Sequence, residues 1–371
     1  MAEKTGIAWA DSKFNPWVGC TKVSPACDNC YAEKWGARFG YKCGPGQPRH
    51  RTSASTWRQP LVWNRKAERQ FSAWEQFKKQ YPGLTDAQLE AQGFHKPTRP
   101  RVFCGSLCDV FDNEVPEQWR HDLFQLIAHT PYLSWLLLTK RIGNARAMIA
   151  DASTIVEYRD ASVPEWTTAR PCPNVWIGAT ICNQEEADRD IPKLLSVPAA
   201  KRFVSMEPLL ARTEIGFAMP WQSTDRGLYK RSLDWVICGG ETGKNARPMH
   251  PAWVRSMRDQ CVAAGVPFFF KQWGEWLPGQ NEVHPSETYS SGHPRCIAHH
   301  QDGRWGATAT KLNKRNYVMW GKDGTTRFGP FSLEKDLRDA VAFDIDAWAE
   351  RVGHKAAGNM LDGRAWTEVP A

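Results

Sequence analysis

Three cysteines lie close together near the start of this chain, and their spacing suits a metal cluster. Cys20, Cys27 and Cys30 have the pattern C-x6-C-x2-C. The loop between them is rich in small and turn-forming residues, which lets the thiols converge on one face of a cluster. An iron–sulfur cluster that is held by three thiolates can offer its fourth iron to a small molecule. The pattern therefore predicts a [4Fe–4S] cluster with one open iron.

Other interpretations of these cysteines remain open. A zinc site needs a fourth ligand, which Cys43 or His50 would supply. The thiols can also be structural residues that bind no metal. A disulfide framework is disfavoured, because the number of cysteines, eleven, is odd and the N-terminal residues do not resemble a signal peptide. We therefore expect a cytoplasmic protein with reduced thiols.

Short apolar runs alternate with helical patterns along residues 1–275, after an irregular lead-in at 1–14. The expected strands are 17–19, 101–105, 133–139, 175–179, 202–206, 235–238 and 267–271, and the expected helices are 31–39, 116–129, 143–150, 184–195 and 251–264. This alternation is typical of parallel strands that are covered by helices. It predicts a partial or complete (β/α) barrel of the TIM type. A doubly wound open sheet is the alternative, although no glycine-rich dinucleotide motif follows the first strand.

Functional residues of such barrels lie at the carboxyl ends of the strands. The residues that follow the seven apolar runs are unusually polar. Besides Cys20, they are Ser106, Asp109, Lys140, Arg141, Thr180, Asn183, Glu207, Glu241, Thr242, Lys271 and Gln272. A barrel mouth lined in this way can hold a charged ligand. The candidate catalytic residues are Glu207, Glu241, Lys140 and Lys271.

Two of these candidates also have simpler explanations. Glu207 precedes Pro208 and can form a salt bridge with Lys140 or Arg141 across the rim. Glu241 belongs to a Gly-Gly-Glu string, which is equally typical of a tight turn after a strand. The salt bridge and the tight turn therefore remain open as alternatives to a catalytic role.

The positive charge of the chain is concentrated in one segment. The net charge is +8, and residues 40–101 contain 12 Lys or Arg against 4 Asp or Glu. Trp57, Trp63, Phe71 and Trp74 are interleaved with these cations, a mixture that suits phosphate contacts and base stacking. This segment, the basic insertion, predicts a nucleic acid or nucleotide as partner. The alternative is an amphipathic helix at 63–80 with a solvated basic face and its aromatic side chains packed on the barrel.

Residues 276–371 differ in composition from the barrel and are expected to form a C-terminal extension. The strings NYVMWG and TRFGPF flank the turn KDGT and predict a small β element. Residues 340–351 have the pattern of an amphipathic helix. No run approaches the roughly 18 to 20 apolar residues of a membrane span, so no membrane partner is expected.

Several strings resemble known proteins. CDNCY, at Cys27 to Tyr31, looks like the signature of the radical S-adenosylmethionine superfamily, whose commonest spacing, C-x3-C-x2-C, is three residues shorter. The strings NPWVGCTKVSPACDNCYAE, LLLTKR, VWIGAT, SMEPLL, CGGETG and FFFKQWGEW more closely resemble an uncharacterised radical-SAM-like family of phage and prophage genomes. This similarity extends from about residue 5 to the C-terminus.

The resemblance implies a chemistry for the barrel mouth. S-adenosylmethionine would bind the open iron and be cleaved to a 5′-deoxyadenosyl radical, with electrons from a donor protein such as flavodoxin or ferredoxin. By analogy, Ser106 and Asp109 would meet the methionyl amino group of the cofactor. The expected cofactor-binding residues are Tyr31, Ser106, Asp109, Thr180, Asn183 and Glu207.

The basic insertion and the phage-associated resemblance together favour a nucleic acid or nucleotide as substrate. Base modification and repair of a photolesion, that is, DNA modification or DNA repair, both fit this substrate. Two other classes of protein stay open. One is a zinc-stabilised nucleic-acid-binding protein without catalysis, and the other is a non-catalytic iron–sulfur protein.

Overall fold

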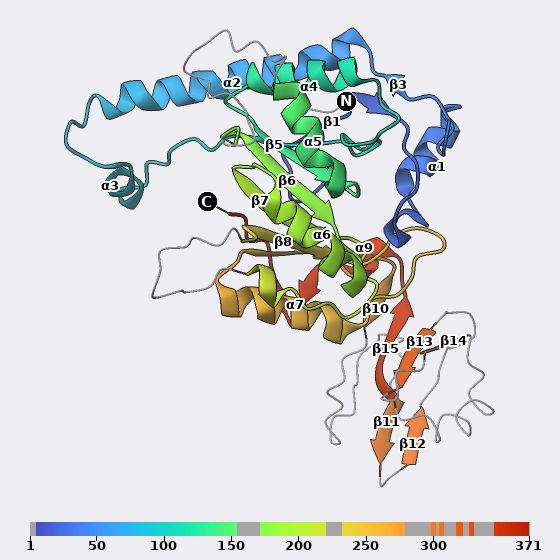
Figure 1. Cartoon of the computed structure of the whole chain (residues 1–371). Helices are drawn as coiled ribbons and strands as arrows, with labels where there is room; N and C mark the ends of the chain where they lie inside the picture. The colour runs from blue at the N-terminus through green and yellow to red at the C-terminus, as the bar shows by residue number, and fades with distance from the viewer. Residues whose placement is uncertain are drawn as a thin grey trace.

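A seven-stranded parallel sheet forms the centre of the protein (Figure 1). The structure, a computed structural model, describes residues 5–153, 171–219, 232–278, 298–301, 304–307, 317–321, 326–329 and 345–370. The strands of the sheet are β1 (Ser12–Phe14), β4 (Arg101–Cys104), β5 (Ser134–Thr139), β6 (Val175–Thr180), β7 (Lys201–Met206), β8 (Trp235–Gly239) and β9 (Phe268–Gln272). They lie side by side in chain order, with β1 and β9 at the edges, and curl into a half-barrel. The predicted partial barrel is thus confirmed, because a doubly wound sheet would reverse the strand order.

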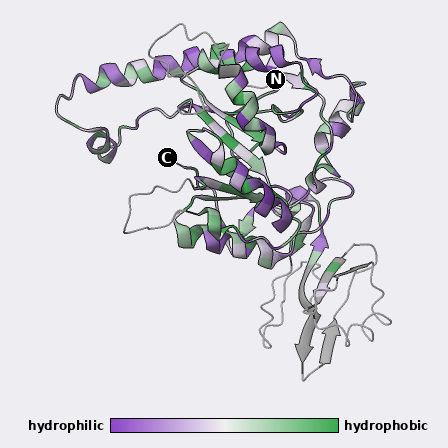
Figure 2. Cartoon of the chain, in the orientation of Figure 1, coloured by the Kyte–Doolittle hydropathy of each residue, from purple (hydrophilic) through white to green (hydrophobic). Residues whose placement is uncertain are grey.

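Helices cover the outer face of the half-barrel. They are α4 (Glu117–Ala128), α5 (Ile142–Ser153), α6 (Gln184–Ser196) and α7 (Pro251–Ala264), with the short turn η2 (Gly216–Ala218) after β7. Ile191 of α6 and Met257 of α7 belong to the same buried cluster as Val204 of β7. Figure 2 shows hydrophobic residues along the central strands, as expected for strands that are covered on both faces.

The inner face of the half-barrel is filled by aromatic rings. Trp176, Phe203, Trp235 and Phe269 point to this face, since they form a second buried cluster that contains no helix residue. Gly178 makes room for them, because a Cβ atom there would lie 2.3 Å from Cζ of Phe203. These rings occupy the inner face toward the amino ends of the strands. Alternate residues of a strand point to the same face, so polar residues further along these strands share the inner face and lie toward the carboxyl ends.

The first strand of the sheet is not the one that the sequence predicts. Residues 17–19 were expected to start the barrel, but β2 (Trp17–Val18) pairs antiparallel with β3 (His50–Arg51) outside the sheet. The first barrel strand is β1, which pairs parallel with β4 and lies in the expected lead-in. The prediction was wrong because β1 is a short edge strand with Lys13 at its centre and shows no apolar run. Its place depends on backbone pairing with β4.

The basic insertion forms an arm that projects from the half-barrel (Figure 1). The arm contains α2 (Ala54–Lys78) and α3 (Asp86–Ala91). α2 begins nine residues before the expected start at 63, because Ser53 caps it and Pro60 is accommodated inside the helix. At the tip, the Phe77 ring packs 4.9 Å from Tyr81 and 4.8 Å from Phe94, measured between ring centroids.

The C-terminal extension contains a separate antiparallel sheet in the order β10-β15-β13-β14. Its strands are β10 (Trp276–Pro278), β13 (Tyr317–Gly321), β14 (Thr326–Gly329) and β15 (Ile345–Arg351), and β11 (Ala298–Gln301) pairs with β12 (Arg304–Ala307). The predicted β element around the turn KDGT is confirmed by β13 and β14. The predicted helix 340–351 was wrong over 345–351, where Ala349 pairs with Val318 in a strand, and 340–344 lie outside the described residues.

The last described segment returns to the half-barrel. It contains α9 (His354–Ala357), β16 (Met360–Leu361) and β17 (Arg364–Ala365). Beyond β17, the backbone N–H of Phe270 donates to Trp366 O at 2.8 Å, and Phe269 and Thr367 form an antiparallel bridge. This tail therefore covers the β9 edge of the sheet. No helix in the described part of the chain has both the length and the hydropathy to cross a membrane.

Candidate active site

The cysteine loop lies over the carboxyl ends of the first strands. It leaves β2 at Gly19, whose φ of 112° suits glycine, and Gly19 forms a bridge with Cys108 just after β4. The turn η1 (Pro25–Cys27) is capped by Ser24. Cys30 occupies the cap position before α1 (Tyr31–Arg38), where the free N–H groups of the helix favour anionic sulfur.

The three thiols do not surround a single ion. Among the described residues, no three ligand atoms from this loop, Cys43 or His50 lie within 4.8 Å of one another. A tetrahedral zinc ion with bonds of about 2.3 Å would require such a group. In a cubane, each thiolate binds a different iron, so the sulfur atoms lie farther apart than around one ion.

A charged clamp fastens the loop to the far side of the half-barrel. Glu241, just after β8, accepts hydrogen bonds from Asn29 Nδ2 at 2.9 Å and from Arg247 Nε at 3.0 Å. Arg247 also donates to Asp28 Oδ2 at 2.9 Å and to Pro25 O at 2.8 Å. Burial raises the pKa of Glu241, but the hydrogen bonds and charge of Arg247 outweigh it and hold the pKa below its usual value. Glu241 therefore positions the loop and is not free to act on a substrate.

A second group of buried charges holds the first cysteine. Nη2 of Arg141 donates a hydrogen bond to Thr21 O at 2.6 Å. Nη1 of Arg141 lies 3.4 Å from Cys20 Sγ and 3.4 Å from Asp109 Oδ2. Burial and the negative charge of Asp109 together raise the pKa of the Cys20 thiol to about 12, although Arg141 lowers it. The free thiol is therefore protonated at neutral pH, and a metal would displace this proton on binding.

Arg49, from the basic insertion, lies beneath the same loop. Its guanidinium is fully buried and pairs with Asp112 at 2.7 Å. It also donates to Thr21 Oγ1 at 2.8 Å and to Gln47 O at 2.9 Å. The start of the insertion is thus part of the support of the cysteine loop.

Two buried oxygens at the barrel mouth lack hydrogen-bond partners among the described residues. They are Oγ1 of Thr180, at the end of β6, and Oε1 of Glu207, after β7. The other carboxylate oxygen of Glu207 accepts from Lys271 Nζ at 2.5 Å. β6 and β7 are neighbours, and Thr180 is in register with Ser205. The predicted salt bridge of Glu207 therefore exists, but with Lys271 instead of Lys140 or Arg141.

The cysteine loop reaches this mouth from two sides. The Cys182 thiol, two residues after Thr180, lies close to Ser24 and Ala26 of the loop. Tyr31, directly after Cys30, is half exposed and lies near Ser106 and Lys271. Loop and mouth thus form one site.

The remaining predicted residues are occupied by structural contacts. Asp109 accepts from Thr139 Oγ1 at 2.6 Å and from the backbone of Lys140 at 3.0 Å. Asn183 caps α6 by accepting from Glu186 N. The Lys140 ammonium has no ion-pair partner in the described part of the chain. The structure brings together Tyr31, Ser106, Glu207, Lys271 and Thr180, whereas the side chains of Asp109, Asn183 and Glu241 are engaged in the contacts described above.

Sequence reasoning missed the residues that hold the loop. Asn29 and Asp28 lie inside the motif, but their partner Arg247 lies 219 positions beyond Asp28 and has no local signal. Arg49 was counted only as part of the basic insertion. Long-range partners of this kind do not leave a periodic pattern.

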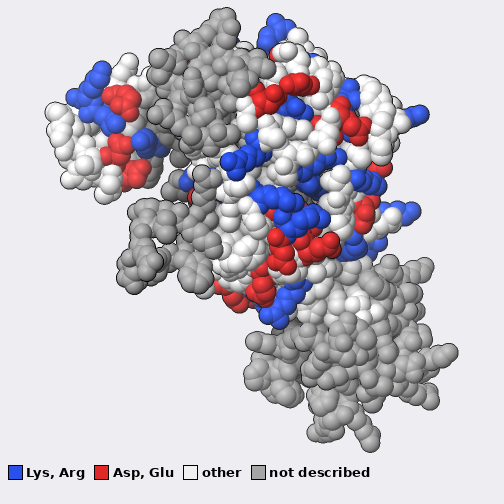
Figure 3. All heavy atoms as spheres, viewed as in Figure 1, with Lys and Arg blue, Asp and Glu red and all other residues white. Residues whose placement is uncertain are grey.

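The aromatic residues of the basic insertion do not face solvent as base stacking would require. Trp63 and Trp74 are buried, Trp57 packs against Phe14 at 5.7 Å, and Phe71 packs against Tyr132 at 5.5 Å. The amphipathic-helix alternative is thus correct for these rings. Several cations of the insertion are also paired, and Figure 3 shows Lys or Arg beside Asp or Glu at the tip of the arm.

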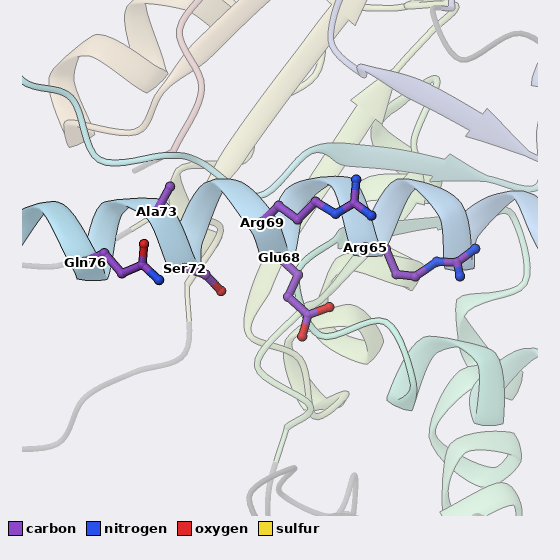
Figure 4. A pocket seen from close by; sticks show the side chains of 6 residues that line it. All are labelled: Arg65, Glu68, Arg69, Ser72, Ala73 and Gln76. Atoms are coloured by element: carbon purple, nitrogen blue, oxygen red, sulfur yellow. The ribbon is translucent and has the colours of Figure 1, made fainter.

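A surface depression and a ligand group lie away from the barrel mouth. The depression runs along α2 and is lined by Arg65, Glu68, Arg69, Ser72, Ala73 and Gln76 (Figure 4). In the described chain, Glu117, His121 and Asp151 have ligand atoms within 4.8 Å of one another on the outer helices. The His121 ring bridges the two acids, since its Nε2 lies 3.2 Å from Asp151 and 3.5 Å from Glu117, so the three side chains serve as one another's partners.

A family model described as "Protein of unknown function (DUF5131)" matches residues 4–370. The chain belongs to this family. No curated protein and no solved structure matches this chain. The description of DUF5131 names no reaction, so the function of this DUF5131 protein must be argued from its site.

Proposed function

We propose that this protein is a radical S-adenosylmethionine enzyme that acts on nucleic acid. The observation that carries the proposal is a pair of buried oxygens, of Thr180 and Glu207, that have no hydrogen-bond partner among the described residues and lie beside a loop with three cysteines. A buried oxygen without a hydrogen bond costs about 1–3 kcal/mol. A ligand with hydroxyl or ammonium donors removes this cost. S-adenosylmethionine has both, as ribose hydroxyls and as its amino group.

In this proposal, the cysteine loop holds a [4Fe–4S] cluster. Cys20, Cys27 and Cys30 would hold it, and the clamp of Glu241 and Arg247 keeps the segment between the last two cysteines in place. When bound with S-adenosylmethionine, such a cluster supplies one electron to the sulfonium, which yields methionine and a 5′-deoxyadenosyl radical that abstracts hydrogen from a substrate.

The residues of the mouth have distinct tasks in this proposal. Glu207 accepts a donor of the cofactor through Oε1, while Lys271 fixes its other oxygen. Tyr31 and Ser106 line the cysteine side of the mouth. The aromatic layer below them excludes water from the inner face of the half-barrel.

Nucleic acid is the proposed substrate because the basic insertion is anchored beside the site. Arg49 connects the insertion to the cysteine loop through Thr21. A substrate that lies along the arm would therefore approach the mouth. Modification of a base and repair of a photolesion both satisfy this geometry, and a protein donor such as flavodoxin or ferredoxin would supply the electrons.

The test is anaerobic purification with iron, sulfide and zinc analysis, followed by electron paramagnetic resonance with and without S-adenosylmethionine. We expect a reduced [4Fe–4S] signal that changes shape with the cofactor. Cys27→Ser should lose the iron. Cys43→Ser is the matched control, because Cys43 is a neighbouring thiol outside the motif, and it should keep the iron.

Stoichiometric zinc without iron would overturn the proposal in favour of the zinc-stabilised binding protein. An iron–sulfur signal that S-adenosylmethionine leaves unchanged would favour the non-catalytic iron–sulfur protein. Glu207→Gln separates these outcomes further. It should weaken the response to S-adenosylmethionine and leave the iron content as in the natural sequence.

A further inference from the structure

One line of residues along α2 faces directly away from the body of the protein. At about 100° per residue, positions that follow one another at steps of three or four residues stay within about 40° of a common line. Trp63, Ala67 and Trp74 are buried, and they lie about 140–180° from this line. The line, which we call the outer stripe, consists of Arg58, Val62, Arg65, Arg69, Ser72 and Gln76.

The outer stripe carries the positive charge of Arg58, Arg65 and Arg69, and Glu68 lies beside Arg65 and Arg69 in the same depression. Arg65 and Arg69 are exposed, and neither has an ion-pair partner in the described part of the chain. The acids of the helix, Glu68 and Glu75, lie about 80–100° to one side. Other cations of the basic insertion differ, since Lys78 pairs with Glu75 and with Asp86. Part of the unpaired positive charge of the insertion therefore lies on the stripe.

The stripe also has the length and shape of a binding surface. Its 18 residue steps span about 27 Å at 1.5 Å per residue, which equals about eight base pairs at 3.4 Å each. Four of its members, from Arg65 to Gln76, line the depression in Figure 4. The arm is anchored at its start by Trp63 on the half-barrel, and at its tip Phe77 of α2 packs on Phe94 of the following segment.

We infer that the outer stripe of α2 binds the phosphate backbone of a duplex nucleic acid. The donors are guanidinium, hydroxyl and amide groups, which are the groups that contact phosphates. No aromatic ring lies on the stripe, so it offers no platform for unpaired bases, which single-strand binding uses. The inference rests on the proposed nucleic-acid substrate and adds how that substrate is held.

The test is fluorescence anisotropy of the full-length protein with a labelled duplex DNA and with one of its strands, at several salt concentrations. We expect tighter binding of the duplex. The variant R65Q/R69Q should bind the duplex weaker by on the order of tenfold or more. The slope of log K against log salt should fall by about 2, one for each lost phosphate contact.

The matched control is K34Q/R38Q, which removes an exposed pair with the same i, i+4 spacing from α1. It should keep the affinity and slope of the natural sequence. Equal losses in both variants, or equal binding of duplex and single strand, would overturn the inference. Thermal unfolding of each variant shows that folding is retained.

The outcome is separable from that of the proposed chemistry. Binding is measured without S-adenosylmethionine, and iron is measured on the same preparation. A protein that binds duplex through the stripe but holds no iron refutes the radical chemistry alone. A protein with a cluster that responds to S-adenosylmethionine, whose duplex binding does not depend on Arg65 and Arg69, refutes the stripe alone.

Discussion

Two arginines of the same basic insertion show how differently one residue type is used. The Arg49 guanidinium is fully buried and paired with Asp112, whose side chain has an exposed fraction of 2%. Arg65 is exposed and has no ion-pair partner among the described residues. The first is part of the support of the cysteine loop, and the second is available to a ligand. Counting charges along the sequence gives both the same weight.

Substitution of the buried arginine, Arg49, should have the largest effect on the stability of the protein. Arg49→Met should lower the free energy of unfolding by about 3–5 kcal/mol, because it leaves Asp112 buried without its main counterion. Urea unfolding measures this. Arg58→Met, an exposed position of the same insertion, is the control and should change the free energy by less than about 0.5 kcal/mol. Similar losses in both variants would contradict the distinction.

The clamp at Glu241 should give a smaller effect that depends on pH. Glu241→Gln should cost about 1.5 kcal/mol at pH 7, since it removes the charge from hydrogen bonds to Arg247. Because the folded-state pKa of Glu241 is lowered, its contribution is complete above the usual pKa of glutamate, about 4.3, and disappears as the pH falls through the folded value.

The measurement is urea unfolding of both proteins between pH 7 and pH 3. The difference in unfolding free energy should be constant near neutral pH and shrink in acid. A difference that stays the same throughout this range would show that the charge of Glu241 does not stabilise the loop.

The smallest expected effect is at the outer stripe. R65Q/R69Q should change the free energy of unfolding by less than about 0.5 kcal/mol, because neither guanidinium has a partner to lose among the described residues. Urea unfolding measures it beside Arg49→Met. A loss of more than about 1 kcal/mol would place these arginines with Arg49 as structural residues.

Much of the sheet was predictable because its signal is local. Strands such as β6 and β8 are continuous apolar runs between helical patterns, and the sequence places them within a residue or two. β1 was missed because it is held by pairing with β4, and β15 was taken for a helix because its alternation is only seven residues long. Both errors arose where long-range pairing decides the structure.

The site was predictable in location more than in role. The rule that polar residues follow barrel strands identified Thr180, Glu207 and Lys271. It also selected Asp109, which the structure uses to bind Thr139 and the backbone. Contacts between distant segments decide which polar residue keeps an oxygen without a hydrogen bond. A single sequence does not reveal these contacts.

The tail after β17 has a consequence for the order of folding. Phe270 and Phe269 at the β9 edge are completed by Trp366 and Thr367, and the Trp235 indole donates to Glu368 O. During synthesis, this edge stays open until residues about 100 positions further on have left the ribosome. A chain cut at 365 would expose an unpaired strand edge, which is a template for aggregation. We therefore expect chains that end before residue 366 to be enriched in the insoluble fraction of expressed protein.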